Sequence, residues 1–132
     1  MQARGSFDVE LTPQPGSDTA GDPTIGRMAI AKRFQGDLEG TSRGEMLATR
    51  TEVEGSAGYV ALERVTATLH GRSGSFSLQH SGVMDRGRKG LTITVVPDSA
   101  TEGLVGLKGT MDIQVGGGAH SYVFDYTLPD PT

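Results

Sequence analysis

Apolar and polar residues alternate with a period of two along most of this chain. In SFDVELT (6–12), Phe7, Val9 and Leu11 fall on one face and the polar residues fall on the other. The segments 27–34, 75–81 and 120–128 show the same alternation. Because successive side chains of a strand point to opposite faces, the pattern predicts β-strands with one apolar face. The only helix candidate is EMLATRTEVE (45–54), whose Thr, Val and flanking Gly residues favour a strand.

Turn signals separate these strand-like segments. They are rich in Gly, Asp, Ser and Pro and occur at 15–23, 36–44, 54–58, 70–75, 85–90, 97–103 and 116–118. Seven connectors leave eight segments within a single domain, residues 1–132. We therefore predict an all-β fold, an eight-stranded antiparallel up-and-down β-barrel, because closure removes the exposed edges of an open sheet. A β-sandwich is the alternative.

Composition narrows the classes of partner. The 20 Gly among 132 residues fit many turns, and the net charge of −4, without Trp or a basic stripe, argues against nucleic acid. The absence of Cys excludes disulfides and thiolate metal sites and fits a reducing cytoplasm. No run approaches the roughly 18 apolar residues of a membrane helix, so we expect a cytoplasmic protein without a membrane partner.

Glu63 interrupts an apolar row in YVALERVTATL (59–69), where Tyr59, Ala61 and Val65 share its face. If this row faces the barrel interior, desolvation would raise the pKa of the carboxyl group toward neutrality, as a general acid or base requires. The alternative is a structural ion pair, with Arg50 for instance.

His80 ends the apolar face of SFSLQHS (75–81), which the HGRSG turn joins to the segment of Glu63. Counting from the turn places both side chains within about two residues of the same level, or ~7 Å along the strands. Cross-strand neighbours lie ~5 Å apart, so we predict that Glu63 and His80 point into the barrel and make a direct or water-bridged contact. Histidine carries protons near neutral pH. The alternative is a core histidine bonded to a carbonyl.

Further candidates lie on apolar faces or at strand ends. Lys32 shares the face of Met28 and Phe34, where a lysine either extends its amine to water or serves a pocket. Glu45 is expected to open the third strand at the cavity mouth. With aromatic pocket walls added, the predicted ligand-binding set is Lys32, Glu45, Tyr59, Phe76 and Tyr126.

A metal centre is not predicted. The remaining histidines, His70 and His120, adjoin glycine-rich turns and are expected to be exposed. The chain has neither an HxH nor an HExxH motif.

Long segments of the chain resemble a family of small bacterial proteins of unknown function. They are GDLEG (36–40), YVALERVTATLHGRSGSFSLQHSG (59–82), LTITVVPDSATEGLVGLKG (91–109) and HSYVFDYTL (120–128). That family is similar to the allene oxide cyclase-like (calycin-like) barrels, a group that also holds the plant dirigent proteins. The resemblance implies an eight-stranded antiparallel barrel with a central cavity. Relatives in the wider group direct cyclisation, isomerisation or coupling of hydrophobic intermediates without a metal or organic cofactor.

Two functions follow from these expectations. The first is a cofactor-free isomerase or cyclase that holds a hydrophobic, polyketide- or lipid-like molecule in the barrel, with Glu63 and His80 as the catalytic pair. The second is a non-catalytic, lipocalin-like carrier. Convergent titratable groups in the pocket favour catalysis, whereas a purely apolar pocket favours carriage. We also expect a homodimer, joined through outward residues such as Thr66, Thr68, Thr92 and Thr94.

Overall fold

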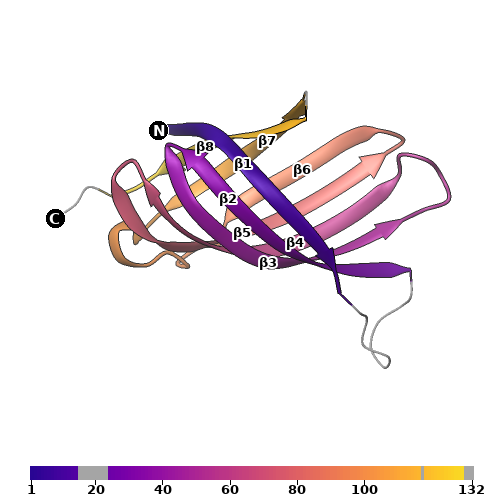
Figure 1. The fold of residues 1–132 in the computed structure, drawn as a ribbon, viewed down its shortest axis with the longest axis horizontal. Helices are drawn as coiled ribbons and strands as arrows, with labels where there is room; N and C mark the ends of the chain where they lie inside the picture. Colours follow the sequence, from indigo (N-terminus) through magenta and orange to yellow (C-terminus); the bar gives the residue numbers. More distant parts are fainter. Residues whose placement is uncertain (15–23, 117, 130–132) are drawn as a thin grey trace.

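Eight antiparallel strands close into a barrel in chain order, as predicted (Figure 1). The computed structural model describes residues 1–14, 24–116 and 118–129. The strands are β1 (Gln2–Pro13), β2 (Ile25–Gly36), β3 (Leu38–Arg50), β4 (Ala57–Leu69), β5 (Arg72–Asp85), β6 (Arg88–Val95), β7 (Lys108–Gly116) and β8 (Ala119–Thr127). A single 3-10 turn, Glu102–Leu104, lies between β6 and β7. The described residues include no helix long and apolar enough to span a membrane.

The hydrophobic core fills one end of the barrel, which we call the closed end. The inward residues there are buried and aromatic-rich, and Phe76 stacks on Phe124 with ring centroids 5.9 Å apart. The segment after β6 covers this end, because its Leu104 and Leu107 are both buried in the core. Figure 1 shows that β1 begins and β8 ends at this same end. Burial of this apolar surface is the main source of the barrel's stability.

The opposite end of the barrel, which we call the open end, is not closed in this way. Inward positions there carry apolar side chains that remain exposed; they are Leu11, Met84, Leu91 and Val115. His120, expected to be exposed, is instead partly buried, and its ring packs 5.2 Å from that of Phe7. The inner surface therefore changes from a packed core to solvent-accessible apolar side chains along the barrel axis.

The predicted turn at 36–44 is too long, because the chain turns between Gly36 and Leu38 and β3 already begins at Leu38. Gly40 and Gly44 lie inside this strand rather than in a turn. A Cβ on Gly44 would lie 2.1 Å from the Leu62 carbonyl oxygen, and one on Gly40 would lie 2.2 Å from that of Thr66. These glycines allow β3 and β4 to approach closely, which is a second use of glycine within strands. The predicted turn at 15–23 lies outside the described residues.

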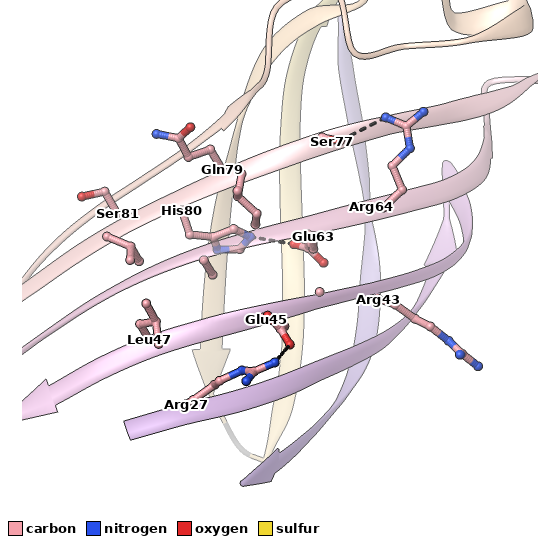
Figure 2. Close-up of a pocket in the computed structure, with 14 residues that line it drawn as sticks. Arg27, Arg43, Glu45, Leu47, Glu63, Arg64, Ser77, Gln79, His80 and Ser81 are labelled. Carbon is pink, nitrogen blue, oxygen red and sulfur yellow. Dashed lines mark hydrogen bonds and ion pairs between the residues drawn. The ribbon is translucent and has the colours of Figure 1, made fainter. Parts of the chain in front are cut away.

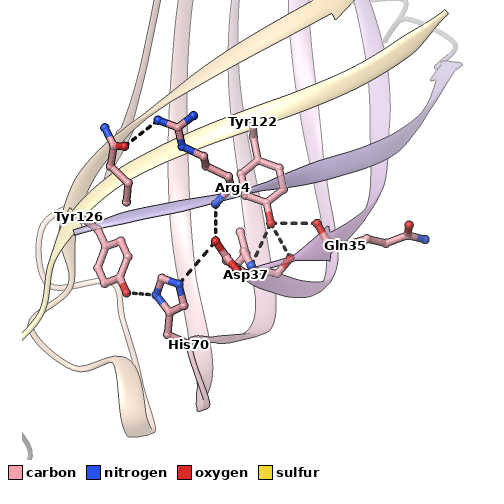
Figure 3. A network of polar contacts seen from close by, with 8 residues as sticks. Arg4, Gln35, Asp37, His70, Tyr122 and Tyr126 are labelled. Atoms are coloured by element: carbon pink, nitrogen blue, oxygen red, sulfur yellow. Dashed lines mark hydrogen bonds and ion pairs between the residues drawn. The ribbon is translucent and has the colours of Figure 1, made fainter.

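The hydroxyl group of Tyr122 forms hydrogen bonds with the backbone on both sides of the β2–β3 turn at the closed end (Figure 3). Its buried hydroxyl group accepts a hydrogen bond from the Leu38 amide at 2.9 Å and lies 3.0 Å from the carbonyl oxygens of Gln35 and Leu38. Burial is the main reason that the pKa of Tyr122 is raised, so the hydroxyl stays protonated.

Tyr122→Phe is expected to lower the free energy of unfolding by about 1–3 kcal/mol, because it leaves the buried Leu38 amide without its acceptor. Urea denaturation monitored by circular dichroism measures this change. A loss no larger than that of a surface substitution, under about 0.5 kcal/mol, would contradict the role assigned to the hydroxyl.

Candidate functional site

Four consecutive strands bring four polar side chains together inside the barrel. Lys32 comes from β2, Ser42 from β3, Glu63 from β4 and His80 from β5, and all four are buried. The Glu63 Oε1 atom lies 2.9 Å from Lys32 Nζ and 2.6 Å from His80 Nε2. The Ser42 hydroxyl donates to Glu63 Oε2 at 2.5 Å. The predicted contact between Glu63 and His80 is confirmed, and Lys32 joins it.

The strand register places these side chains at one level. Lys32 pairs directly with Ser42 across β2 and β3, and His80 pairs with Ala61 on β4, two residues before Glu63. Gly44 is opposite Glu63 and leaves room for the backbone of β4 at that point, because a Cβ there would lie 2.6 Å from the Glu63 Cα and 2.9 Å from its Cβ. The register of the four strands is therefore sufficient to bring the four side chains to the same level inside the barrel.

Glu63 is ionised in this cluster, in contrast to the prediction from sequence. Burial raises the pKa of its carboxyl group, but the His80 hydrogen bond, the Lys32 charge and the Ser42 hydrogen bond together lower it from 4.5 to about 2. A carboxylate with so low a pKa is a weak base at neutral pH. Its physical role is to hold the two basic side chains in place.

His80 keeps one ring nitrogen available. Every fully buried side-chain nitrogen or oxygen of the described residues has a hydrogen-bond partner. Among those residues the hydrogen bond of His80 is made through Nε2 to Glu63. Its Nδ1 atom therefore makes no hydrogen bond within the described residues and is not completely buried, although the residue as a whole is only 4% exposed. A histidine fixed by a carboxylate on one nitrogen and open on the other has the arrangement of a proton carrier.

One further predicted residue, Tyr59, borders this cluster. The Tyr59 ring lies 6.3 Å from that of His80, and burial followed by the Glu63 charge raises the pKa of its phenol, which therefore stays protonated. The Lys32 ammonium group lies 5.2 Å from the Phe7 ring centroid. Aromatic faces stabilise such a cation where water is scarce. Glu63, His80, Lys32 and Tyr59 thus form one site, which we call the inner site.

The other predicted ligand-binding residues lie elsewhere. Glu45 does not open β3 at a cavity mouth; it lies in the middle of the strand, on the outer face of the barrel, 2.5 Å from Arg27. Phe76 is fully buried in the core, and Tyr126 is buried at the closed end. These two aromatic residues pack the core and are not part of the inner site.

Tyr126 instead belongs to a second polar cluster at the closed end (Figure 3). Its hydroxyl shares a hydrogen bond with His70 Nδ1, and His70 Nε2 lies 3.6 Å from Asp37 Oδ2. Asp37 also accepts a hydrogen bond from the Arg4 amide at 2.9 Å. Burial and then the Asp37 charge raise the pKa of Tyr126. The cluster ties together the β2–β3 turn, the β4–β5 turn and β8.

Sequence reasoning missed Ser42 and chose the wrong ion-pair partner for Glu63. Arg50, the suggested partner, is exposed near the end of β3, and Lys32 takes its place. Ser42 fell within the stretch assigned to a turn, so its inward direction was hidden. Among the described residues, no three His, Asp, Glu or Cys side chains are grouped as metal ligands.

A pocket of about 760 Å³ lies on the outer face of the barrel (Figure 2). Most of its lining residues are outward positions of β2, β3, β4 and β5. The lining also includes Glu63 and His80 of the inner site, whose side chains point inward from β4 and β5. The resemblance had implied a central cavity, whereas this pocket is outside the barrel.

The family model of DUF3224, a protein family of unknown function, matches residues 3–126. The fold is similar to the crystal structure of a DUF3224 protein of unknown function from Shewanella oneidensis, with 46% sequence identity and a TM-score of 0.91. That similarity covers 99% of this chain and 98% of the other. No curated protein matches. The resemblance to a bacterial family of unknown function is confirmed.

Proposed function

Because this chain belongs to the DUF3224 family, whose membership assigns no activity, we propose a function from the inner site itself. The protein binds an apolar small molecule at the open end of the barrel and catalyses proton transfer in its isomerisation or cyclisation. The side chains supply the acid–base groups, so the proposal requires no cofactor. The substrate class is a hydrophobic, polyketide- or lipid-like molecule with an acidic C–H beside a carbonyl group.

The observation that carries this proposal is the 2.6 Å hydrogen bond between His80 Nε2 and Glu63, with no hydrogen bond on His80 Nδ1 within the described residues. His80 would take a proton from substrate carbon on Nδ1 and return it to another atom of the same molecule. The ionised Glu63 would stabilise the imidazolium formed between these two transfers. Lys32 and Ser42 would keep the carboxylate in position, which makes both of them positioning residues.

Side chains at the open end support an apolar substrate. Leu11, Met84 and Leu91 face inward there and are exposed to solvent, which is costly for large apolar side chains unless a ligand covers them. The protonated phenol of Tyr59 would donate a hydrogen bond to a substrate carbonyl group near His80.

The test is deuterium exchange from D₂O into apolar conjugated enones, with β-ionone as the first probe, followed by NMR. We expect the protein to accelerate exchange and His80→Gln to reduce the rate by about 10²-fold or more. Glu45→Gln, which changes a carboxylate on the outer face, is the matched control and should leave the rate unchanged. A full exchange rate in His80→Gln would remove His80 from the catalytic role.

The carrier function is the second candidate, and the exposed inward apolar side chains favour it equally. Binding of the neutral fluorescent probe N-phenyl-1-naphthylamine, without any enone exchange, would establish carriage rather than catalysis. The homodimer stays a prediction from sequence. A monomer mass by light scattering at tens of micromolar protein would contradict it.

A further inference from the structure

The outer pocket combines an apolar floor with charged walls (Figure 2). Leu47, Val60 and Leu62 form its floor and are 47%, 53% and 57% exposed, respectively. They are neighbours on β3 and β4, because Leu47 pairs with Val60 and Leu62 follows two residues along the same face. A concave apolar surface of this volume is of the size that binds small molecules.

Two arginines occupy neighbouring positions at one end of this floor. Arg43 on β3 and Arg64 on β4 are direct cross-strand partners on the outer face. Like charges in directly opposite positions of a sheet destabilise it, unless an anion lies between them. Arg64 donates hydrogen bonds to Ser77 Oγ at 3.0 Å and to the Ser99 carbonyl at 2.8 Å, both uncharged acceptors. Within the described residues Arg43 has no hydrogen bond or ion pair, and Figure 2 shows its guanidinium group turned away from that of Arg64.

The other outward charged side chains of the pocket, Arg27 and Glu45, form an ion pair with each other. Glu45, its only acidic side chain facing outward, is paired with Arg27 at 2.5 Å. Within the part of the chain that the structure describes, the guanidinium groups of Arg43 and Arg64 therefore have no anionic partner, although the whole chain has a net charge of −4. This local excess of positive charge lies at one end of the apolar floor only, which favours a ligand with one anionic end.

We propose that the outer pocket binds a free single-chain carboxylate. Its head group lies between Arg43 and Arg64 once the Arg43 side chain, which has no partner within the described residues, turns toward Arg64, because planar guanidinium groups bind carboxylate oxygens in pairs. Its hydrocarbon chain runs along β4 over Leu62 and then Val60. Four residues separate Arg64 from Val60, so the site is ~13 Å long, at ~3.3 Å per residue. A saturated chain of about ten to twelve carbons matches that length. The side chains proposed to hold this ligand face outward, whereas those of Glu63 and His80, which also border the pocket, face inward, so this proposal does not depend on the proposed function.

The test is isothermal titration calorimetry with dodecanoate below its micelle concentration. We expect saturable binding that weakens by about tenfold or more in Arg43→Gln and in Arg64→Gln, because each removes a charge-assisted hydrogen bond. Leu62→Ser should also weaken binding. Arg88→Gln, which removes an exposed arginine of β6 outside the pocket, is the matched control and should bind as the wild type does. Neutral dodecanol should bind at least tenfold more weakly than dodecanoate.

Several results would overturn the proposal. Dodecanoate binding that is unchanged in Arg43→Gln and Arg64→Gln but lost in His80→Gln would move the ligand to the inner site. Binding to phosphatidylglycerol vesicles without binding to free dodecanoate would indicate a membrane surface. A dimer that Arg43→Gln or Leu62→Ser converts to a monomer, without dodecanoate binding to the wild type, would make this face an interface between copies. Enone exchange and N-phenyl-1-naphthylamine binding should not change in the arginine variants, so a failure here is distinguishable from a failure of the proposed function.

Discussion

Glu63→Gln is expected to lower the free energy of unfolding by about 3–5 kcal/mol, the cost of removing one partner from a buried ion pair. Glu63 is 1% exposed and Lys32 is 8% exposed, so the lysine would be left in the barrel without a negative partner. The carboxylate accepts from Lys32, Ser42 and His80 through two oxygens, whereas the amide has one oxygen and an uncharged NH₂ donor in place of the other. Urea denaturation at pH 7 measures the loss.

Two comparisons make this result specific to the cluster. Glu45→Gln removes an equally charged side chain from the exposed pair with Arg27 and should cost less than about 1 kcal/mol. Lys32→Met combined with Glu63→Gln should cost clearly less than the sum of the two single changes, because the residues interact directly. Additive losses would mean that Lys32 and Glu63 do not stabilise each other.

The sequence was sufficient to predict the contact between Glu63 and His80. The two residues lie on strands joined by a short turn, so a period-two pattern and a residue count determine both their face and their level. The structure has the same inward face for Glu63, Val65 and Ala67 on β4. Local pattern was enough because the contact is between neighbouring strands of one hairpin.

The rest of the inner site depends on neighbours that the local pattern could not place. Gly40 and Gly44 looked like turn residues, yet they serve close strand packing, so β3 begins at Leu38 instead of Glu45. Because of this error Ser42 was not recognised as an inward residue, and Glu45 was expected at the start of β3 instead of in its middle. The pKa of Glu63 was expected to rise because only burial was considered. Lys32 and Ser42 lie beside the carboxylate, and the pKa is lowered instead. The sign of a shift depends on every group in contact, not on burial alone.

The outer pocket was also beyond sequence reasoning. Arg43, Leu47, Val60 and Leu62 each occupy ordinary outward positions of a strand, and isolated exposed apolar residues are common. What makes them a site is the hollow on the outer face that four neighbouring strands form together. That shape follows from the twist and closure of the whole sheet, which the period-two pattern does not specify.

Acid should remove the contribution of Glu63 to stability within a defined pH range. The pKa of Glu63 is about 2 in the folded protein against 4.5 for the free group, so folding favours the ionised form. The stabilisation is complete above about pH 4.5 and is lost as the pH falls through about 2. The shift corresponds to roughly 3 kcal/mol, at 1.36 kcal/mol per unit of pKa.

Urea denaturation of the wild type and of Glu63→Gln, repeated between pH 6 and pH 2, tests this linkage. The difference in unfolding free energy between the two proteins should stay constant down to about pH 4.5 and then shrink by roughly 3 kcal/mol as the pH approaches 2, because protonation makes the wild-type side chain as neutral as the amide. The comparison cancels the titration of carboxyl groups that both proteins share. A difference that holds its full size at pH 2.5 and below would mean that the ionised carboxylate is not what stabilises the cluster. The hydrogen bonds of the neutral side chain with Ser42 and His80 would then explain its effect.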